Sequence, residues 1–156
     1  MKSIGIIALT LTLLAPMASC QNKSADKKQV ETKTVATKGI EHLTAATFKQ
    51  KVFNYDKNKQ WKFEGNKPCI IDFYADWCGP CRMLAPTIEQ VAKEYNGKID
   101  VYKVNVDEQQ ELASNFGISS IPAVLFCPST DKPQMTTGVL SKEEMDKAIK
   151  ELLKVK

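Results

Sequence analysis

The stretch Trp77-Cys78-Gly79-Pro80-Cys81 decides the interpretation of this chain. Two cysteines separated by two residues, at the junction of a strand and a helix, form a reversible dithiol/disulfide pair. A tight turn brings both sulfurs within bonding distance, and Pro80 sets the first helical φ at a position that needs no N–H donor. The spacing therefore predicts thiol-disulfide exchange, a chemistry that needs no metal, nucleotide or flavin.

The two cysteines have different predicted roles. Cys78 lies at the helix start, where unpaired N–H groups and the helix dipole stabilise a thiolate, so we expect it to be the nucleophile. Cys81 lies one turn further along and faces the interior, which suits a less accessible resolving thiol. A structural zinc site would need two more ligands. The other cysteines are single and His42 is the only histidine, so we expect no metal.

The first 19 residues are typical of an export signal. Met1-Lys2 is a short basic start, and residues 4–17 are mostly apolar but too short to span a bilayer comfortably. Residues 14–20 resemble a bacterial lipobox, so we expect lipidation of Cys20. Met17 stands where that motif usually has leucine, which leaves simple cleavage after Ser19 as the alternative. We expect an exported, periplasmic, membrane-anchored lipoprotein.

The rest of the chain divides into a tether and one domain. Residues 20–38 carry hardly any large apolar side chain, which predicts a flexible tether. Residues 39–156 are enough for a single compact core. The formal net charge of +4 is modest and the lysines are spread along the sequence, so we expect no nucleic-acid binding.

Hydrophobic periodicity predicts an alternation of strands and helices in the domain. Residues 55–68 predict a polar loop, residues 69–75 a strand buried on both faces, and Pro86 a kink within the helix that follows the cysteines. Thr44 and Ser141 are predicted helix caps. The other predicted elements are an edge strand at 39–43, strands at 101–106, 123–127 and 134–137, and a short helix at 111–116. This order indicates an α/β fold whose mixed sheet is flanked by helices on both faces.

At this point the chain resembles the thioredoxin family over nearly all of residues 39–156. The motifs that carry the resemblance follow in family order: the segment from Asp72 to Cys81, Asn105-Val106-Asp107, Phe116-Gly117-Ile118, Ile121-Pro122 and Gly138. The resemblance implies the thioredoxin fold and a Cys78–Cys81 disulfide.

The resemblance also implies roles beside the cysteines. Asp72 matches the family's buried carboxylate, whose pKa desolvation should raise, so we expect it to transfer protons to and from Cys81. Lys103 matches a lysine near this aspartate and would lower that pKa. The alternatives are that Asp72 is only a buried acid with its hydrogen bonds satisfied, and that Lys103 faces solvent. Pro122 matches a cis proline, which would let the Ile121 backbone pair with an extended substrate segment.

The family's substrate surface maps onto a small apolar set. By resemblance it comprises Trp77, Gly79, Pro80, Ile121, Pro122 and Gly138, with Val106 as a further candidate. Tyr74 stands where many members have tryptophan, and Thr137 where a small apolar residue is common, which affects substrate preference. If their strands are antiparallel neighbours as in the family, Cys69 and Cys127 lie close together, as two buried thiols or as a second disulfide.

We therefore expect a protein-disulfide reductase of the cell envelope, a monomer acting on exported proteins. The Gly79-Pro80 dipeptide resembles that of reducing members, whereas export to an oxidising compartment favours disulfide formation. A reductant outside the cytoplasm needs electrons from a membrane thiol-transferring donor. Two other functions stay open, namely net oxidation or isomerisation of exported proteins, and a tethered binding module without redox turnover.

Overall fold

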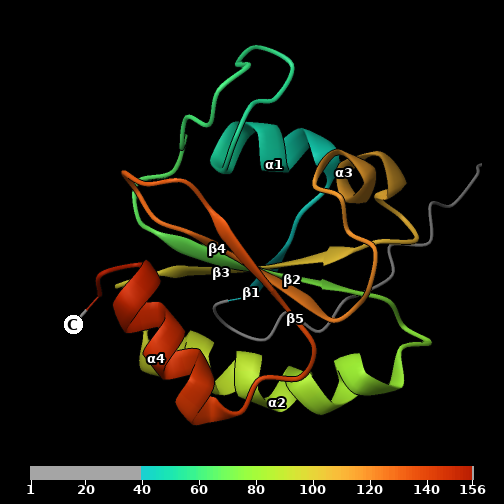
Figure 1. Ribbon diagram of the computed structural model, residues 1–156, viewed down its shortest axis with the longest axis vertical. Coiled ribbons are helices and arrows are strands. Elements are labelled where there is room, and N and C mark those ends of the chain that lie inside the picture. Colours follow the sequence, from blue (N-terminus) through green and yellow to red (C-terminus); the bar gives the residue numbers. More distant parts are fainter. Residues whose placement is uncertain (1–39, 156) are drawn as a thin grey trace, which may run out of the picture. The chain divides into compact units, whose positions relative to one another are not determined.

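The computed structural model describes residues 40–155, and the predicted signal, tether and lipid anchor lie outside them. Strands and helices alternate in the predicted order (Figure 1). The elements are β1 (Ile40–His42), α1 (Ala45–Lys51), β2 (Cys69–Tyr74), α2 (Gly79–Glu94), β3 (Asp100–Asn105), α3 (Gln110–Asn115), β4 (Ala123–Cys127), β5 (Gln134–Thr137) and α4 (Lys142–Leu152).

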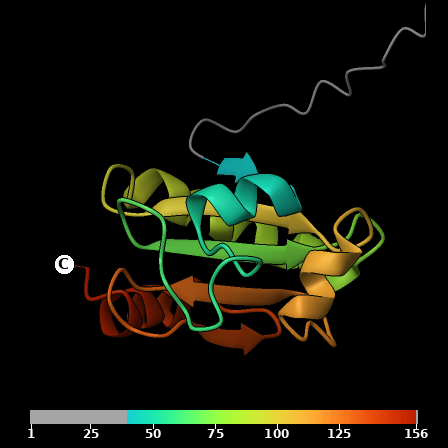
Figure 2. The same ribbon diagram turned by 90° about the horizontal axis from the view of Figure 1, so that it is seen from above.

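The five strands form one mixed sheet in the order β1-β3-β2-β4-β5. The strand β3 pairs in parallel with β1 and β2, whereas β4 is antiparallel to both β2 and β5. Figure 2 shows the arrows of β2 and β4 running in opposite directions side by side. The predicted α/β mixed sheet of the thioredoxin fold is confirmed, with the apolar strand β2 at its centre.

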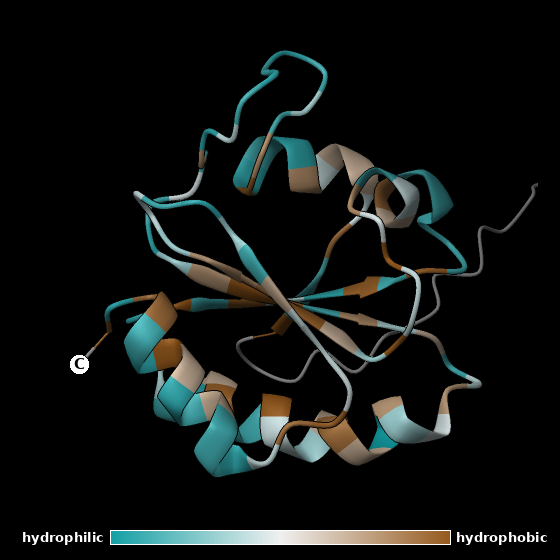
Figure 3. Ribbon diagram, in the orientation of Figure 1, coloured by the Kyte–Doolittle hydropathy of each residue, from teal (hydrophilic) through white to brown (hydrophobic). Residues whose placement is uncertain are grey.

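Helices cover both faces of the sheet, and each face has its own core. In Figure 1 α1 and α3 lie on one side of the sheet and α2 and α4 on the other. Alternate residues of β2 divide accordingly: Ile70 packs with α2 and α4, and Ile71 packs with the α1 side. Figure 3 shows hydrophobic stretches in the strands at the centre of the sheet and hydrophilic residues on the outer side of α4. This alternation fixes which β2 side chains face α2.

Local signals at the helix ends match the predictions. Thr44 and Ser141 both cap their helices through capping boxes, in which the third helical residue returns a side-chain contact to the cap. The helix α2 does not end at Pro86 but continues to Glu94.

Of the described helices, none has the length and apolar character needed to cross a bilayer.

The segment 52–68 differs from the polar loop predicted for residues 55–68. It contains no helix or strand, as expected, but four of its aromatic side chains pack against the core on the α1 side: Phe53, Tyr55, Trp61 and Phe63. The ring centroids of Phe53 and Trp61 lie 4.8 Å apart. The loop is therefore anchored by apolar contacts on the sheet face away from α2.

Candidate active site

The two cysteines lie where β2 delivers the chain into α2. Cys78 is the N-cap of α2 in extended backbone conformation, and its Sγ accepts a hydrogen bond from the Cys81 N–H at 3.1 Å. Gly79 and Pro80 are the first helical residues, as the proline's missing N–H requires. A sulfur at this position meets the positive end of the helix dipole, which stabilises a Cys78 thiolate.

Cys78 and Cys81 form a disulfide with an S–S distance of 2.03 Å. Both residues are almost fully buried in this oxidised state, at 3% and 4% exposure. The expected difference in accessibility between the two is therefore not visible here. The two cysteines differ instead in their position, because Cys78 caps the helix and Cys81 lies within its first turn.

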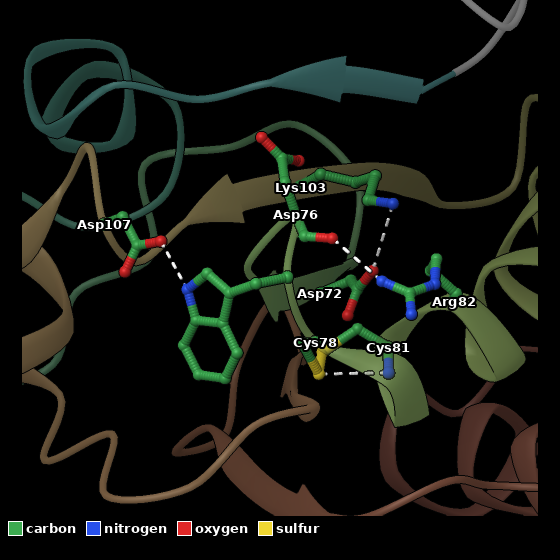
Figure 4. The surroundings of a disulfide bond; sticks show 8 residues. Asp72, Asp76, Cys78, Cys81, Arg82, Lys103 and Asp107 are labelled. Atoms are coloured by element: carbon green, nitrogen blue, oxygen red, sulfur yellow. Dashed lines mark hydrogen bonds and ion pairs between the residues drawn. A yellow bond between two sulfur atoms is a disulfide. The ribbon is translucent and has the colours of Figure 1, made fainter.

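Asp72 is a buried carboxyl on the sheet face that α2 covers. It is 1% exposed, and it is two residues from Ile70 in β2, which packs against α2. Figure 4 shows its carboxyl between Lys103 and the cysteine pair. Among the described residues no group donates a hydrogen bond to either carboxylate oxygen. Burial raises the pKa of Asp72 to about 6, and Lys103 opposes that rise.

Lys103 is the ionic partner of Asp72. The two residues pair across β3 and β2, and the Lys103 Nζ lies 3.4 Å from Asp72 Oδ2. The lysine side chain is only 17% exposed, so the alternative of a solvent-facing residue is wrong. Its Nζ also lies 4.4 Å from the centroid of the Tyr74 ring. A carboxyl with a pKa near neutrality beside a dithiol can take and return a proton.

The predicted substrate residues surround the disulfide on several loops. Trp77 is 69% exposed, and its Nε1 donates a hydrogen bond to Asp107 Oδ2 at 2.8 Å (Figure 4). The Ile121-Pro122 bond is cis, as expected from the resemblance. Ile121 packs against the small cluster formed by Ala75 and the two cysteines, as does Val106.

Gly138 completes this surface from the end of β5. Its N–H donates to the Pro122 carbonyl at 2.9 Å, and its φ of 95° lies in the left-handed region that glycine tolerates. Val139 beside it is 43% exposed. This hydrogen bond ties Gly138 to the loop whose Ile121 packs against the two cysteines, and the exposed Trp77 directly precedes Cys78. Backbone and apolar groups are therefore left for a partner.

Asp107 is a site residue to which the sequence analysis gave no role. Its carboxylate fixes the exposed Trp77 indole, and its N–H donates to Asn105 Oδ1 at 3.0 Å. The signal was present in the Asn105-Val106-Asp107 motif, but only the fold brings that loop beside Trp77. Arg82 was also missed, and its Nη1 donates to the Asp76 carbonyl at 3.0 Å.

Cys69 and Cys127 face each other on β2 and β4, so the predicted proximity is confirmed. Both are free thiols and buried. The pKa of Cys69 is raised well above its ordinary value, first by the Cys127 thiol and then by burial. They lie at the end of β2 away from Cys78 and act as small core residues.

The described residues contain no cluster of three or more histidine, cysteine, aspartate or glutamate side chains that would suit a metal.

Comparison with known proteins gives one consistent result. The family model described as Thioredoxin matches residues 39–151. A thioredoxin of Borreliella burgdorferi is 45% identical over 109 residues, which cover 70% of this chain and 93% of that protein. Thioredoxin 1 of Nostoc sp. is 39% identical over 111 residues, covering 71% and 94%. A crystal structure of chloroplastic thioredoxin z superposes with a TM-score of 0.61 at 27% identity, covering 72% of this chain and 93% of that one.

Proposed function

The chain belongs to the thioredoxin family, and from this premise we propose that it reduces protein disulfides in the cell envelope through Cys78 and Cys81. Its relatives are thiol-disulfide oxidoreductases, and so is this chain. The redox group is the disulfide within the chain, and no external cofactor takes part. The main observation that supports this proposal is the disulfide at the start of α2, which lies on the sheet face that holds the buried Asp72.

The first step is attack by the Cys78 thiolate on one sulfur of a substrate disulfide. A new S–S bond forms between Cys78 and the substrate, and the other substrate sulfur leaves as a thiolate that takes up a proton. The helix N-terminus favours the attacking thiolate. The apolar surface around Trp77 and Ile121 holds an extended substrate segment, with little selection by side chains.

The second step is resolution of this mixed disulfide by Cys81. The Asp72 carboxylate takes the proton of the Cys81 thiol, and the resulting thiolate attacks Cys78 Sγ. The bond between Cys78 and the substrate breaks, the second substrate sulfur leaves as a thiolate that takes the proton back from Asp72, and the Cys78–Cys81 bond of the described structure forms. Two electrons have then passed from the enzyme dithiol to the substrate, together with one proton from Cys81 and one from solvent.

Reduction of insulin disulfides by the full chain, with dithiothreitol as electron source, tests this function. We expect Cys78→Ser to abolish turnover and Cys81→Ser to accumulate the mixed disulfide, visible by mass spectrometry. Cys69→Ser is the matched control, since that thiol lies away from the site. Turnover that survives Cys78→Ser would refute the proposal.

The envelope location rests on the sequence of residues 1–20. An export signal followed by lipidation of Cys20 would attach the enzyme to a membrane, and its substrates would be exported proteins. Mass analysis of the N-terminal peptide from a membrane fraction tests this. A diacylglyceryl adduct on Cys20 supports the anchor, whereas unmodified Cys20 or an intact Met1 contradicts it.

A reductase in that location needs a membrane protein that supplies thiol electrons. We infer such a donor from the direction of the reaction, because each turnover leaves the enzyme oxidised. Acid quenching and thiol alkylation of growing cells report the state of Cys78 and Cys81. A mainly reduced pair supports the reductase and its donor. A mainly oxidised pair, with a reduction potential well above the roughly −270 mV of reducing thioredoxins, favours a net oxidase or isomerase.

A further inference from the structure

Three titratable side chains lie in one row across three strands beside the active site. His42 on β1 pairs with Lys103 on β3, and Lys103 pairs with Asp72 on β2. Residues paired in this way project to the same face of a sheet. Tyr74 is two residues after Asp72 and projects to that face as well. The row therefore leads from the edge of the sheet to the proton-transfer carboxyl.

Direct contacts join the members of this row. The Tyr74 hydroxyl and His42 Nδ1 lie 3.2 Å apart, and the two rings meet edge to face with centroids 5.9 Å apart. The Lys103 Nζ lies 4.4 Å from the Tyr74 ring centroid and 3.4 Å from Asp72 Oδ2. The ammonium is thus held between an aromatic ring and a carboxylate, and the ring is held by the histidine.

The position of Lys103 decides how well ionised Asp72 is stabilised. Among the described residues, no group donates a hydrogen bond to the carboxylate, and Lys103 is its ionic partner. A lysine side chain has many rotamers, and fixing one costs entropy unless packing selects it. The face of the Tyr74 ring attracts a cation and selects the rotamer that reaches Asp72.

We propose that His42 and Tyr74 are positioning residues that hold the Lys103 ammonium beside Asp72, and thereby set the pH range in which Asp72 exchanges protons with Cys81. This inference rests on the proposed function. The hydrogen bond from the Tyr74 hydroxyl to a neutral His42 orients the ring, and the ring orients the ammonium. Tyr74 also packs against the cluster formed by Ala75, Cys78 and Cys81, but both residues act on Asp72 through Lys103.

The charges around His42 favour the neutral ring that this arrangement needs. Burial and Lys103 lower its pKa, whereas Glu108 and Asp76 raise it, and the net direction is downward. The pKa of Tyr74 is raised, chiefly by burial, so its hydroxyl keeps its proton and can donate a hydrogen bond to Nδ1 when the neutral ring carries its own proton on Nε2. Protonation of His42 would turn Nδ1 into a donor and place a second cation beside Lys103.

The test is titration of the Asp72 carboxyl carbon by NMR in the full-length protein, both oxidised and reduced. We expect His42→Leu and Tyr74→Leu each to raise the pKa of Asp72 by about half a unit, or about threefold in its acid constant. His42→Asn keeps an acceptor near the Nδ1 position and should restore the original titration. Tyr102→Phe is the matched control, because Tyr102 faces the other side of the sheet.

An Asp72 titration unchanged in His42→Leu would overturn the proposal; His42 is exposed, so its replacement should leave the core intact. An unchanged titration in Tyr74→Leu, or the same shift in His42→Asn as in His42→Leu, would also overturn it. Insulin reduction measured on the same samples separates the two claims. Normal turnover with unshifted Asp72 removes only this inference, whereas absent turnover in the unmodified protein removes the proposed function.

Discussion

Replacing Asp72 by asparagine should stabilise the folded, oxidised protein at neutral pH while it slows resolution by Cys81. The carboxyl is 1% exposed, and burial raises its pKa from the ordinary value of 3.8 to about 6. The folded protein therefore holds this proton more tightly than the unfolded chain does. Between these two pKa values the folded state binds more protons, so stability falls as pH rises.

The size of the effect follows from the two pKa values. Because its pKa is shifted from 3.8 to about 6, Asp72 lowers the free energy of unfolding by about 3 kcal/mol at pH 7 and by only about 0.5 kcal/mol at pH 4. Asparagine is similar in shape, does not ionise and offers Lys103 a carbonyl oxygen. The variant should thus gain about 3 kcal/mol over the original protein at pH 7, with little gain at pH 4.

Urea unfolding followed by far-UV circular dichroism at pH 4 and pH 7 measures both values. Asp76→Asn is the control, since Asp76 is exposed and its replacement should change stability by less than about 0.5 kcal/mol. A gain for Asp72→Asn that is equal at both pH values would refute the reasoning, because it would come from packing rather than from ionisation. Lower stability of this variant at pH 7 would refute it as well.

Other perturbations have equally definite outcomes. Lys103→Met should raise the pKa of Asp72 further, so that the acid limb of the pH profile for insulin reduction moves to higher pH; an unmoved limb contradicts the ion pair. Ser141→Ala removes the cap that accepts from Glu144 and should cost about 1 kcal/mol in urea unfolding; no loss would mean that the cap is dispensable. Cys127→Ala should cost about 1 kcal/mol through lost packing, with insulin turnover unchanged; lost turnover would assign Cys127 a redox role.

Most of the fold could be predicted because local signals and topology agree. The apolar run of β2 predicted a central strand, and the capping box at Ser141 predicted the start of α4. The aromatic packing of residues 52–68 was not predicted, since lysines and asparagines between Phe53 and Phe63 conceal the apolar positions and no period links them. Such contacts depend on the path of the loop over the core.

The parts of the site that lie within short sequence motifs could be predicted. Only two residues separate Cys78 from Cys81, and their pairing follows from this spacing. The row from His42 to Asp72 joins residues of three strands, and it depends on strand register that local patterns do not specify. The contact of Asp107 with Trp77 likewise depends on where two loops meet.

The strand order has a consequence for how the chain matures. The central strand β2 is flanked by β3, which follows soon after it, and by β4, which is synthesised only after α3. Until β4 pairs, one edge of the central strand β2 stays open, and an open apolar edge invites pairing with other chains. The nascent polypeptide therefore needs protection against aggregation until Cys127 has been made.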